Sequence, residues 1–132
     1  MKASLLLAAA VALVGASPPQ GFQRTPEAQA KLDKLIEGRV AGEPRRCVKS
    51  HTTDNPIGID DRTMMFRDGP RLWRTELLSA FRCSELGLNR MLVTVNKNIQ
   101  LCRGDTTYIV DSKDGSPVAT CVVGDFVPYT KP

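Results

Sequence analysis

The sequence contains few of the residues and motifs that mark common catalytic or cofactor-binding proteins. Its 132 residues include one histidine, one tryptophan, two tyrosines and four phenylalanines. It has no G-x-S-x-G elbow, no H-E-x-x-H motif and no glycine-rich phosphate loop, which are the usual signatures of serine hydrolases, zinc proteases and nucleotide-binding proteins. It also lacks a C-x-x-C pair, the usual mark of a thiol redox site. We therefore expect no cofactor and no metal centre.

The chain also lacks an apolar run long enough to span a membrane. The one long run, residues 4–14 (SLLLAAAVALV), follows a positively charged start and has the length of a signal-peptide core. Small side chains at positions −3 and −1 favour cleavage between Ala16 and Ser17. Residues 1–16 are thus predicted to be a signal peptide. The mature protein is predicted to be periplasmic or secreted, without stable membrane insertion.

Charge of one sign does not dominate the sequence. The chain has 18 lysines and arginines and 14 aspartates and glutamates, which gives a formal net charge of +4. No basic run is interleaved with aromatic residues. This pattern argues against a nucleic-acid partner and favours weak attraction to anionic surfaces.

One amphipathic helix is expected near the start of the mature chain. Two prolines and a glycine make residues 17–24 a flexible lead. Thr25 suits the N-cap, Pro26 suits the first helical position, and apolar residues then recur at helical spacing. With Gly38 as the residue that ends it, the helix is predicted over residues 25–38.

From residue 45 onward, short runs rich in β-branched and aromatic residues alternate with turn residues. This pattern predicts an all-β domain over residues 45–132, a small antiparallel barrel or sandwich of about six short strands. The expected strands are Cys47–Ser50, Thr63–Arg67, Arg71–Glu76, Met91–Val95, Thr106–Asp111 and Val118–Val123.

Asp68-Gly69 predicts a hairpin between the second and third of these strands. We expect Phe66 to pair with Arg71, which would place Met64, Phe66 and Trp73 on one face of the hairpin.

Four cysteines, Cys47, Cys83, Cys102 and Cys121, predict two disulfides formed in an oxidising compartment. The apolar core of so small a domain leaves a thin margin of stability, so covalent links suit it. Four cysteines allow three pairings, and the spacing does not choose among them.

Five short motifs follow one another along the chain: Ile59-Asp60-Asp61-Arg62-Thr63, Gly69…Trp73-Arg74, Cys83…Leu86-Gly87, Leu101-Cys102…Asp105 and Cys121-Val122-Val123-Gly124-Asp125-Phe126-Val127-Pro128-Tyr129. In this order they resemble an uncharacterised family of small, exported, signal-peptide-bearing proteobacterial proteins, and the resemblance covers the chain from about Gly38 to the end. It implies a periplasmic or secreted location and brings no activity, substrate or catalytic residue.

The same resemblance implies a disulfide pairing. Some family members lack counterparts of both Cys83 and Cys121, which implies Cys47–Cys102 with Cys83–Cys121. Cys83–Cys102 with Cys47–Cys121 stays open as the alternative.

His51 is the one histidine through which a small exported hydrolase could work. With Asp54, or with Asp60 and Asp61, it could form a general base or a metal site. One histidine is few for a transition-metal site, and the turn residues around it indicate an exposed loop. Asp60 and Asp61 are adjacent, so in an extended segment they point to opposite sides. A hydrolase using His51 is kept as an alternative, with no catalytic residue assigned.

Arginines gather on the first predicted hairpin, near the single tryptophan. Strand alternation places Arg74 on the face opposite Trp73, pointing outward beside Arg67. Arg67 and Arg74 together are the candidate anion-binding surface, because guanidinium groups suit carboxylate, phosphate and sulfate. Such arginines also protect edge strands from aggregation.

These features favour a non-catalytic, periplasmic or secreted binding or inhibitory module of the cell envelope. Its expected partner is an anionic envelope component or protein. A purely structural envelope protein is the other alternative.

Overall fold

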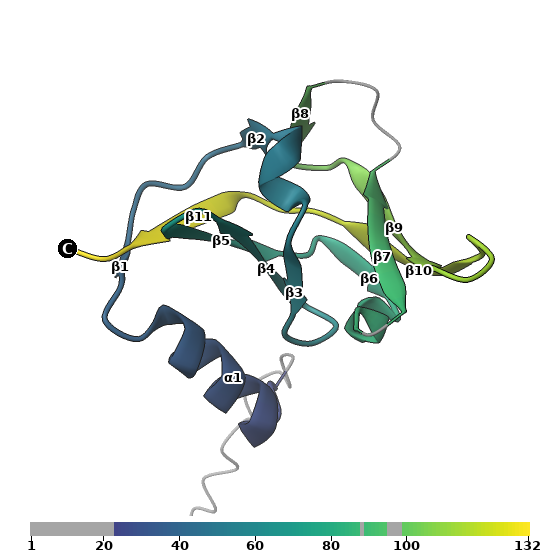
Figure 1. Cartoon of the computed structure of the whole chain (residues 1–132). Coiled ribbons are helices and arrows are strands. Elements are labelled where there is room, and N and C mark those ends of the chain that lie inside the picture. Colours follow the sequence, from purple (N-terminus) through teal and green to yellow (C-terminus); the bar gives the residue numbers. More distant parts are fainter. Residues whose placement is uncertain (1–22, 88, 95–98) are drawn as a thin grey trace, which may run out of the picture.

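The computed structural model describes residues 23–87, 89–94 and 99–132. The predicted signal peptide, its cleavage site at Ala16 and Ser17, and residues 17–22 of the predicted lead lie outside the described residues. The described part holds eleven strands in three antiparallel sheets, one α-helix and two short 3₁₀ helices (Figure 1). The predicted predominance of β structure is therefore confirmed.

Sheet A is the five-stranded sheet, with the spatial order β1-β11-β5-β4-β3. The β4–β5 hairpin lies in its middle, and β11 lies between β5 and β1. The strands are β1 (Val40–Ala41), β3 (Pro56–Gly58), β4 (Thr63–Asp68), β5 (Arg71–Glu76) and β11 (Phe126–Thr130).

Sheet C is four-stranded with the order β6-β10-β9-β7, and sheet B pairs β2 with β8. Sheet B lies at the top of Figure 1, above the ends of the two larger sheets. The remaining elements are β2 (Cys47–Lys49), η1 (Ser50–Thr53), β6 (Ser79–Phe81), η2 (Cys83–Glu85), β7 (Arg90–Thr94), β8 (Gln100–Cys102), β9 (Thr106–Asp111) and β10 (Pro117–Val122).

The main core lies between the facing sides of sheets A and C. Met64, Phe66 and Trp73 project from the β4–β5 hairpin into a cluster that includes Ile109 and Cys121 of sheet C. Four of these residues are fully buried, and Trp73 is 3 % exposed. The predicted common face of Met64, Phe66 and Trp73 is confirmed.

The two disulfides join Cys47 to Cys102 and Cys83 to Cys121, which is the pairing that the family resemblance implies. Cys47–Cys102 links the two strands of sheet B. Cys83–Cys121 ties η2 to β10, and both of its residues are fully buried in the main core. Two disulfides indicate that the chain folds in an oxidising compartment.

Helix α1 (Pro26–Ile36) covers the other face of sheet A. The Thr25 side chain accepts a hydrogen bond from the Ala28 N–H, which satisfies one of the free donors at the helix start. Leu32, which is 1 % exposed, packs against Met65 and Leu72 in a second apolar cluster. Sheet A is thus the middle layer of the molecule.

The chain crosses from sheet C to sheet A between β10 and β11, and Gly124 makes that crossing possible. A Cβ atom at this position would lie 2.2 Å from the carbonyl oxygen of Glu76 at the end of β5. The Gly124 N–H donates to Thr75 Oγ1 at 3.0 Å. Close backbone approach therefore requires glycine here.

The structure corrects the predicted strand number and the barrel alternative. All six predicted strands are present, and five short ones join them: β1, β3, β6, β8 and β11. The three sheets stay open, so the fold is not a closed barrel. Four of the five have only two or three residues, too few for a recognisable alternation, and β11 contains Pro128, which argues against a strand when read locally.

The predicted hairpin register is wrong by two residues. Phe66 pairs with Trp73, and Asp68 pairs with Arg71. The turn consists of Gly69 and Pro70 alone, and Gly69 takes a φ of +57° that glycine tolerates best. A shift of two residues keeps every side chain on its predicted face, which is why the face prediction holds.

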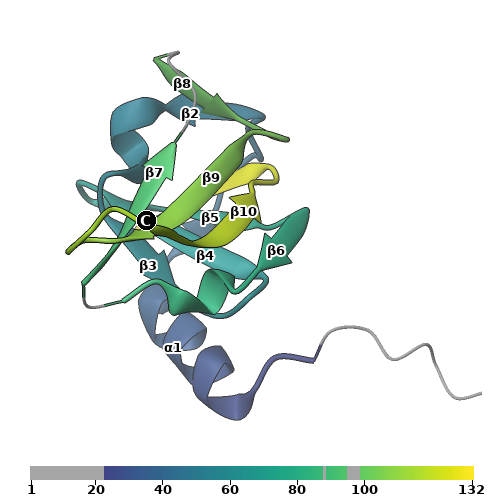
Figure 2. The ribbon, with the colours of Figure 1, turned by 90° about the vertical axis from the view of Figure 1, so that its right-hand side faces the viewer.

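Sheet C presents its outer face to the viewer in Figure 2, and none of the described elements covers that face. Phe81, Met91 and Val93 are exposed there by 66 %, 52 % and 39 %. Among the described residues, no helix is both long and apolar enough to cross a bilayer.

Candidate anion-binding cavity

The single tryptophan forms the floor of a cavity on the hairpin of sheet A. The two-residue turn sets Asp68 opposite Arg71 and places Arg71 and Trp73 on the same face, because they are two residues apart in β5. The Trp73 indole Nε1 donates to Asp68 Oδ2 at 3.3 Å. This hydrogen bond fixes the orientation of a ring that is otherwise enclosed by the core.

Two guanidinium groups lie over the same indole ring. The guanidinium carbon of Arg71 is 5.4 Å from the ring centroid, and that of Arg45 is 5.7 Å away. Both distances are within the range of a cation–π interaction. Arg45 is held by an isolated antiparallel bridge in which its backbone N–H donates to the Phe126 carbonyl at 2.7 Å and its carbonyl accepts from the Phe126 N–H at 2.8 Å.

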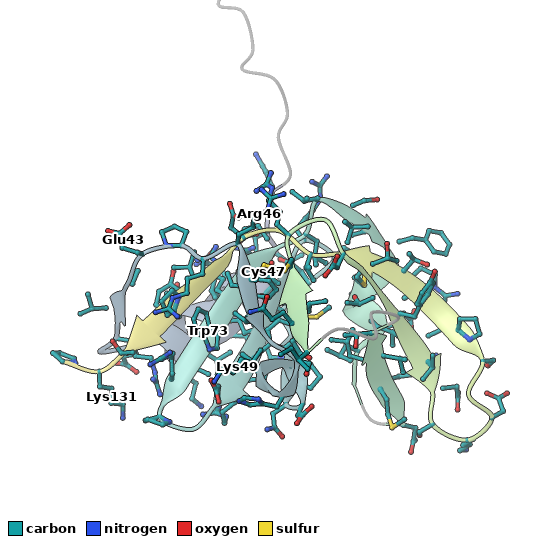
Figure 3. The ribbon with its side chains drawn as sticks, turned by 90° about the horizontal axis from the view of Figure 1, so that it is seen from above. Glu43, Arg46, Cys47, Lys49, Trp73 and Lys131 are labelled. Carbon is teal, nitrogen blue, oxygen red and sulfur yellow. A yellow bond between two sulfur atoms is a disulfide. The ribbon has the colours of Figure 1, made fainter. Side chains whose placement is uncertain are left out.

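Sheet B supplies the remaining wall and a third cation, Lys49. Trp73, Cys47 and Lys49 gather in one region of Figure 3, whereas Glu43 is drawn farther from the ring. The Cys47–Cys102 disulfide holds β2 to β8 beside this cavity. The cavity has a volume of about 360 Å³ and is lined by Arg45, Cys47, Val48, Lys49, His51, Thr52, Asp68, Arg71, Trp73 and Gln100.

The lining has an excess of positive charge. Arg45, Lys49 and Arg71 face one carboxylate, Asp68, whose Oδ2 accepts the Trp73 hydrogen bond. Guanidinium groups stacked on an aromatic ring keep their N–H edges available for oxygen acceptors. The arrangement is therefore suited to a carboxylate, phosphate or sulfate group.

Arg67 and Arg74, the residues singled out from the sequence, lie on the opposite face of the hairpin. Arg74 is engaged within the protein: its Nε donates to Glu76 Oε1 at 2.6 Å and its Nη1 to the Tyr129 hydroxyl at 3.4 Å. Burial lowers the pKa of Arg74, but the hydrogen bonds and charges of Glu76 and Tyr129 outweigh that effect and raise the pKa. Arg67 is exposed on the same face. The structure thus joins Arg74 to a carboxylate and leaves Arg67 in solvent.

Arg74 and Tyr129 also line a cavity of about 370 Å³ at this side of sheet A. The cavity contains a second internal ion pair, in which Arg103 Nη1 lies 2.9 Å from Asp125 Oδ2. Each arginine in its wall already has a carboxylate partner, so it offers no spare cation.

Two of the three carboxylates considered as partners of His51 are hydrogen-bonded to other groups. Asp60 accepts from Arg24 Nε and from the backbone of its own turn, and Asp61 accepts from the Ser84 N–H. Asp54 stays close to His51, and both line a larger cavity of about 580 Å³. In the described part of the chain, no three His, Cys, Asp or Glu side chains gather as a metal site.

Arg45 and Lys49 were not recognised as site residues from the sequence. Arg71 lies two residues before Trp73 in a predicted strand, so strand alternation places the two side chains on one face. Arg45 and Lys49 belong to a basic segment around Cys47, which was the only sign of them in the sequence. Their position beside Trp73 depends on the Arg45–Phe126 bridge and on the pairing of β2 with β8, which the sequence does not reveal.

No protein-family model matches the chain, and no curated protein or solved structure is significantly similar to it.

Proposed function

We propose that this chain is a non-catalytic binding module, exported to the periplasm or secreted, that holds an anionic group in the Trp73 cavity. The partner is an anionic component or protein of the cell envelope. The proposed location is supported by the apolar run near the N-terminus, by the resemblance to small exported proteins and by the two disulfides.

One observation carries the proposal: two guanidinium groups and a lysine share a cavity with a single buried indole. Clustered cations repel one another, and a bound anion removes that repulsion. The concave form and the aromatic floor are typical of sites that hold a small group by a few oriented polar contacts.

Trp73 is the only tryptophan, so its fluorescence reports directly on the cavity. Inorganic phosphate and citrate, titrated at constant ionic strength, are expected to change that fluorescence in a saturable way. Arg71→Gln combined with Lys49→Gln should weaken binding by about tenfold or more, because charge-assisted hydrogen bonds are lost.

The matched control is Arg67→Gln combined with Lys113→Gln, which removes the same charge from exposed positions elsewhere. It should leave affinity within about twofold, since exposed charges are screened by salt. Equal weakening in both double variants, or no saturable change in either probe, would show that the cavity is not the site.

A further inference from the structure

The cavity that contains His51 and Asp54 lies where the open edges of sheets A and C face each other. β3 is the edge strand of sheet A and β7 is the edge strand of sheet C. Pro56 of β3 and four of the five residues of β7 line the 580 Å³ cavity, together with residues of η1. His51 is the one residue that it shares with the Trp73 cavity. The volume is in the range of ligand-binding pockets.

Arg90, the first residue of β7, lines this cavity and carries an unsatisfied donor. Its Nη1 atom is buried and makes no hydrogen bond to any part of the chain that the structure describes. Asp54 lines the same cavity and forms no hydrogen bond with Arg90. The charge of Arg90 helps to lower the pKa of Asp114, but the Asp114 carboxylate accepts its hydrogen bonds from Ser116. A buried, unpaired guanidinium atom is costly, and an anionic oxygen would offset that cost.

The positive charge at this end of β7 is not isolated. Arg90 also lines a smaller cavity of about 330 Å³ that contains Lys31 of α1. The Lys31 Nζ donates to the Gly58 carbonyl at 2.6 Å and forms no ion pair with a carboxylate of the described residues. An anion beside Arg90 in this smaller cavity would therefore lie close to two cations.

The free edge of β7 supplies a template for an added strand. β7 pairs with β9 along one side only, so alternate backbone N–H and C=O groups on its other side face away from the sheet. A strand that adds antiparallel to β7 would run toward Arg90 and end beside it. Its outward side chains would continue the exposed apolar surface of Met91 and Val93.

We infer that this cleft binds an extended peptide that adds antiparallel to β7 and places its C-terminal carboxylate on Arg90. Main-chain hydrogen bonds to β7 supply affinity, and the carboxylate supplies direction and register. The preferred peptides carry apolar side chains at alternate positions, matching Met91 and Val93. This site is separate from the proposed anion site at Trp73.

The test is a selection of six-residue peptides with free C-termini against the oxidised protein, with the Arg90→Gln variant as counterselection. An enriched peptide is then synthesised as the acid and as the amide. The acid should bind the wild type about tenfold tighter than the amide, since a charge-assisted hydrogen bond is lost on amidation. Arg90→Gln should abolish that difference, and amide resonances of residues 90–94 should shift on binding.

Arg82→Gln is the control, because it removes an exposed arginine that is paired with Glu85 on the other side of sheet C. It should preserve the preference for the acid, as should Arg71→Gln with Lys49→Gln, which disables only the Trp73 cavity. Equal binding of acid and amide, failure to enrich any peptide over the Arg90→Gln protein, or resonance shifts confined to other strands would overturn the inference.

A second measurement does not depend on finding a peptide. Arg90→Met should unfold at the same temperature as the wild type or at a higher one, because it removes a buried donor that has no partner in the free protein. A clearly lower unfolding temperature would show that Arg90 stabilises the fold by itself, and would overturn its assignment as a ligand contact.

Discussion

Sheets A and C share one core, but only sheet A has its outer face covered by another described element. Helix α1 covers the outer face of sheet A, where Leu32 packs on fully buried Met65. None of the described elements covers the outer face of sheet C, where Phe81 and Met91 are more than half exposed (Figure 2). Residues at comparable strand positions therefore have very different surroundings.

The polar groups follow the same division. Just before α1 begins, Arg24 Nε donates to Asp60 Oδ2 at 2.7 Å, and Arg24 Nη2 also donates to the Thr63 hydroxyl. That buried hydroxyl donates in turn to Glu76 Oε2 at 2.6 Å. Sheet A thus has a second interface with both apolar and ionic contacts. Sheet C has no such second interface among the described elements. It is held by the shared core and by the Cys83–Cys121 disulfide to η2.

The largest effect should come from removing the link that serves sheet C. Replacing Cys83 and Cys121 by alanine should lower the free energy of unfolding by about 4 kcal/mol or more, from lost chain constraint plus a cavity at two fully buried positions. Replacing the partly exposed Cys47 and Cys102 should cost less, because little buried volume is lost. Urea unfolding of the two double variants measures the difference, and an equal or reversed order would contradict it.

A matched pair of methionines compares the outer faces directly. Met65→Ala, between sheet A and α1, should cost about 2–5 kcal/mol, because it empties a fully buried position. Met91→Ala, on the outer face of sheet C, should change stability by less than about 0.5 kcal/mol. Both values come from urea unfolding. A cost for Met91→Ala close to that of Met65→Ala would mean that sheet C is covered in solution.

The smallest effect concerns the turn between β9 and β10 of sheet C. The Ser116 N–H and then its hydroxyl donate to the exposed Asp114 carboxylate and lower its pKa. A depressed pKa in the folded state stabilises the protein above the unfolded pKa, and this contribution is lost as pH falls through the folded value. Asp114→Asn should therefore lower the unfolding temperature slightly at pH 7 and have no effect below about pH 2. A difference that persists in strong acid would assign the effect to something other than this charge.

The sequence predicted all four six-residue strands, β4, β5, β9 and β10, and missed β1, β3, β6, β8 and β11. β5 and β9 have the predicted bounds, because each is a six-residue run with strong strand preference and clear turns beside it. β3 and β11 contain Pro56 and Pro128, which argue against a strand when read locally. Their pairing depends on partners far along the chain, which local patterns do not reveal.

The candidate site was predictable only in part for the same reason. Arg71 and Trp73 belong to one hairpin, so their proximity follows from alternation alone. Arg45 and Lys49 reach the ring through sheet B and the bridge to Phe126. The Tyr129 partner of Arg74 was equally hidden, because Tyr129 comes beside it only through the pairing of β11 with β5.

The position of β11 has a consequence for the order in which the molecule can be built. Phe126–Thr130 occupies an interior place in sheet A, between strands made much earlier in synthesis. The β4–β5 hairpin can form as soon as it is made, but one of its edges stays unpaired and the Phe126 position in the core stays empty until these residues arrive. Folding therefore waits for nearly the whole described chain.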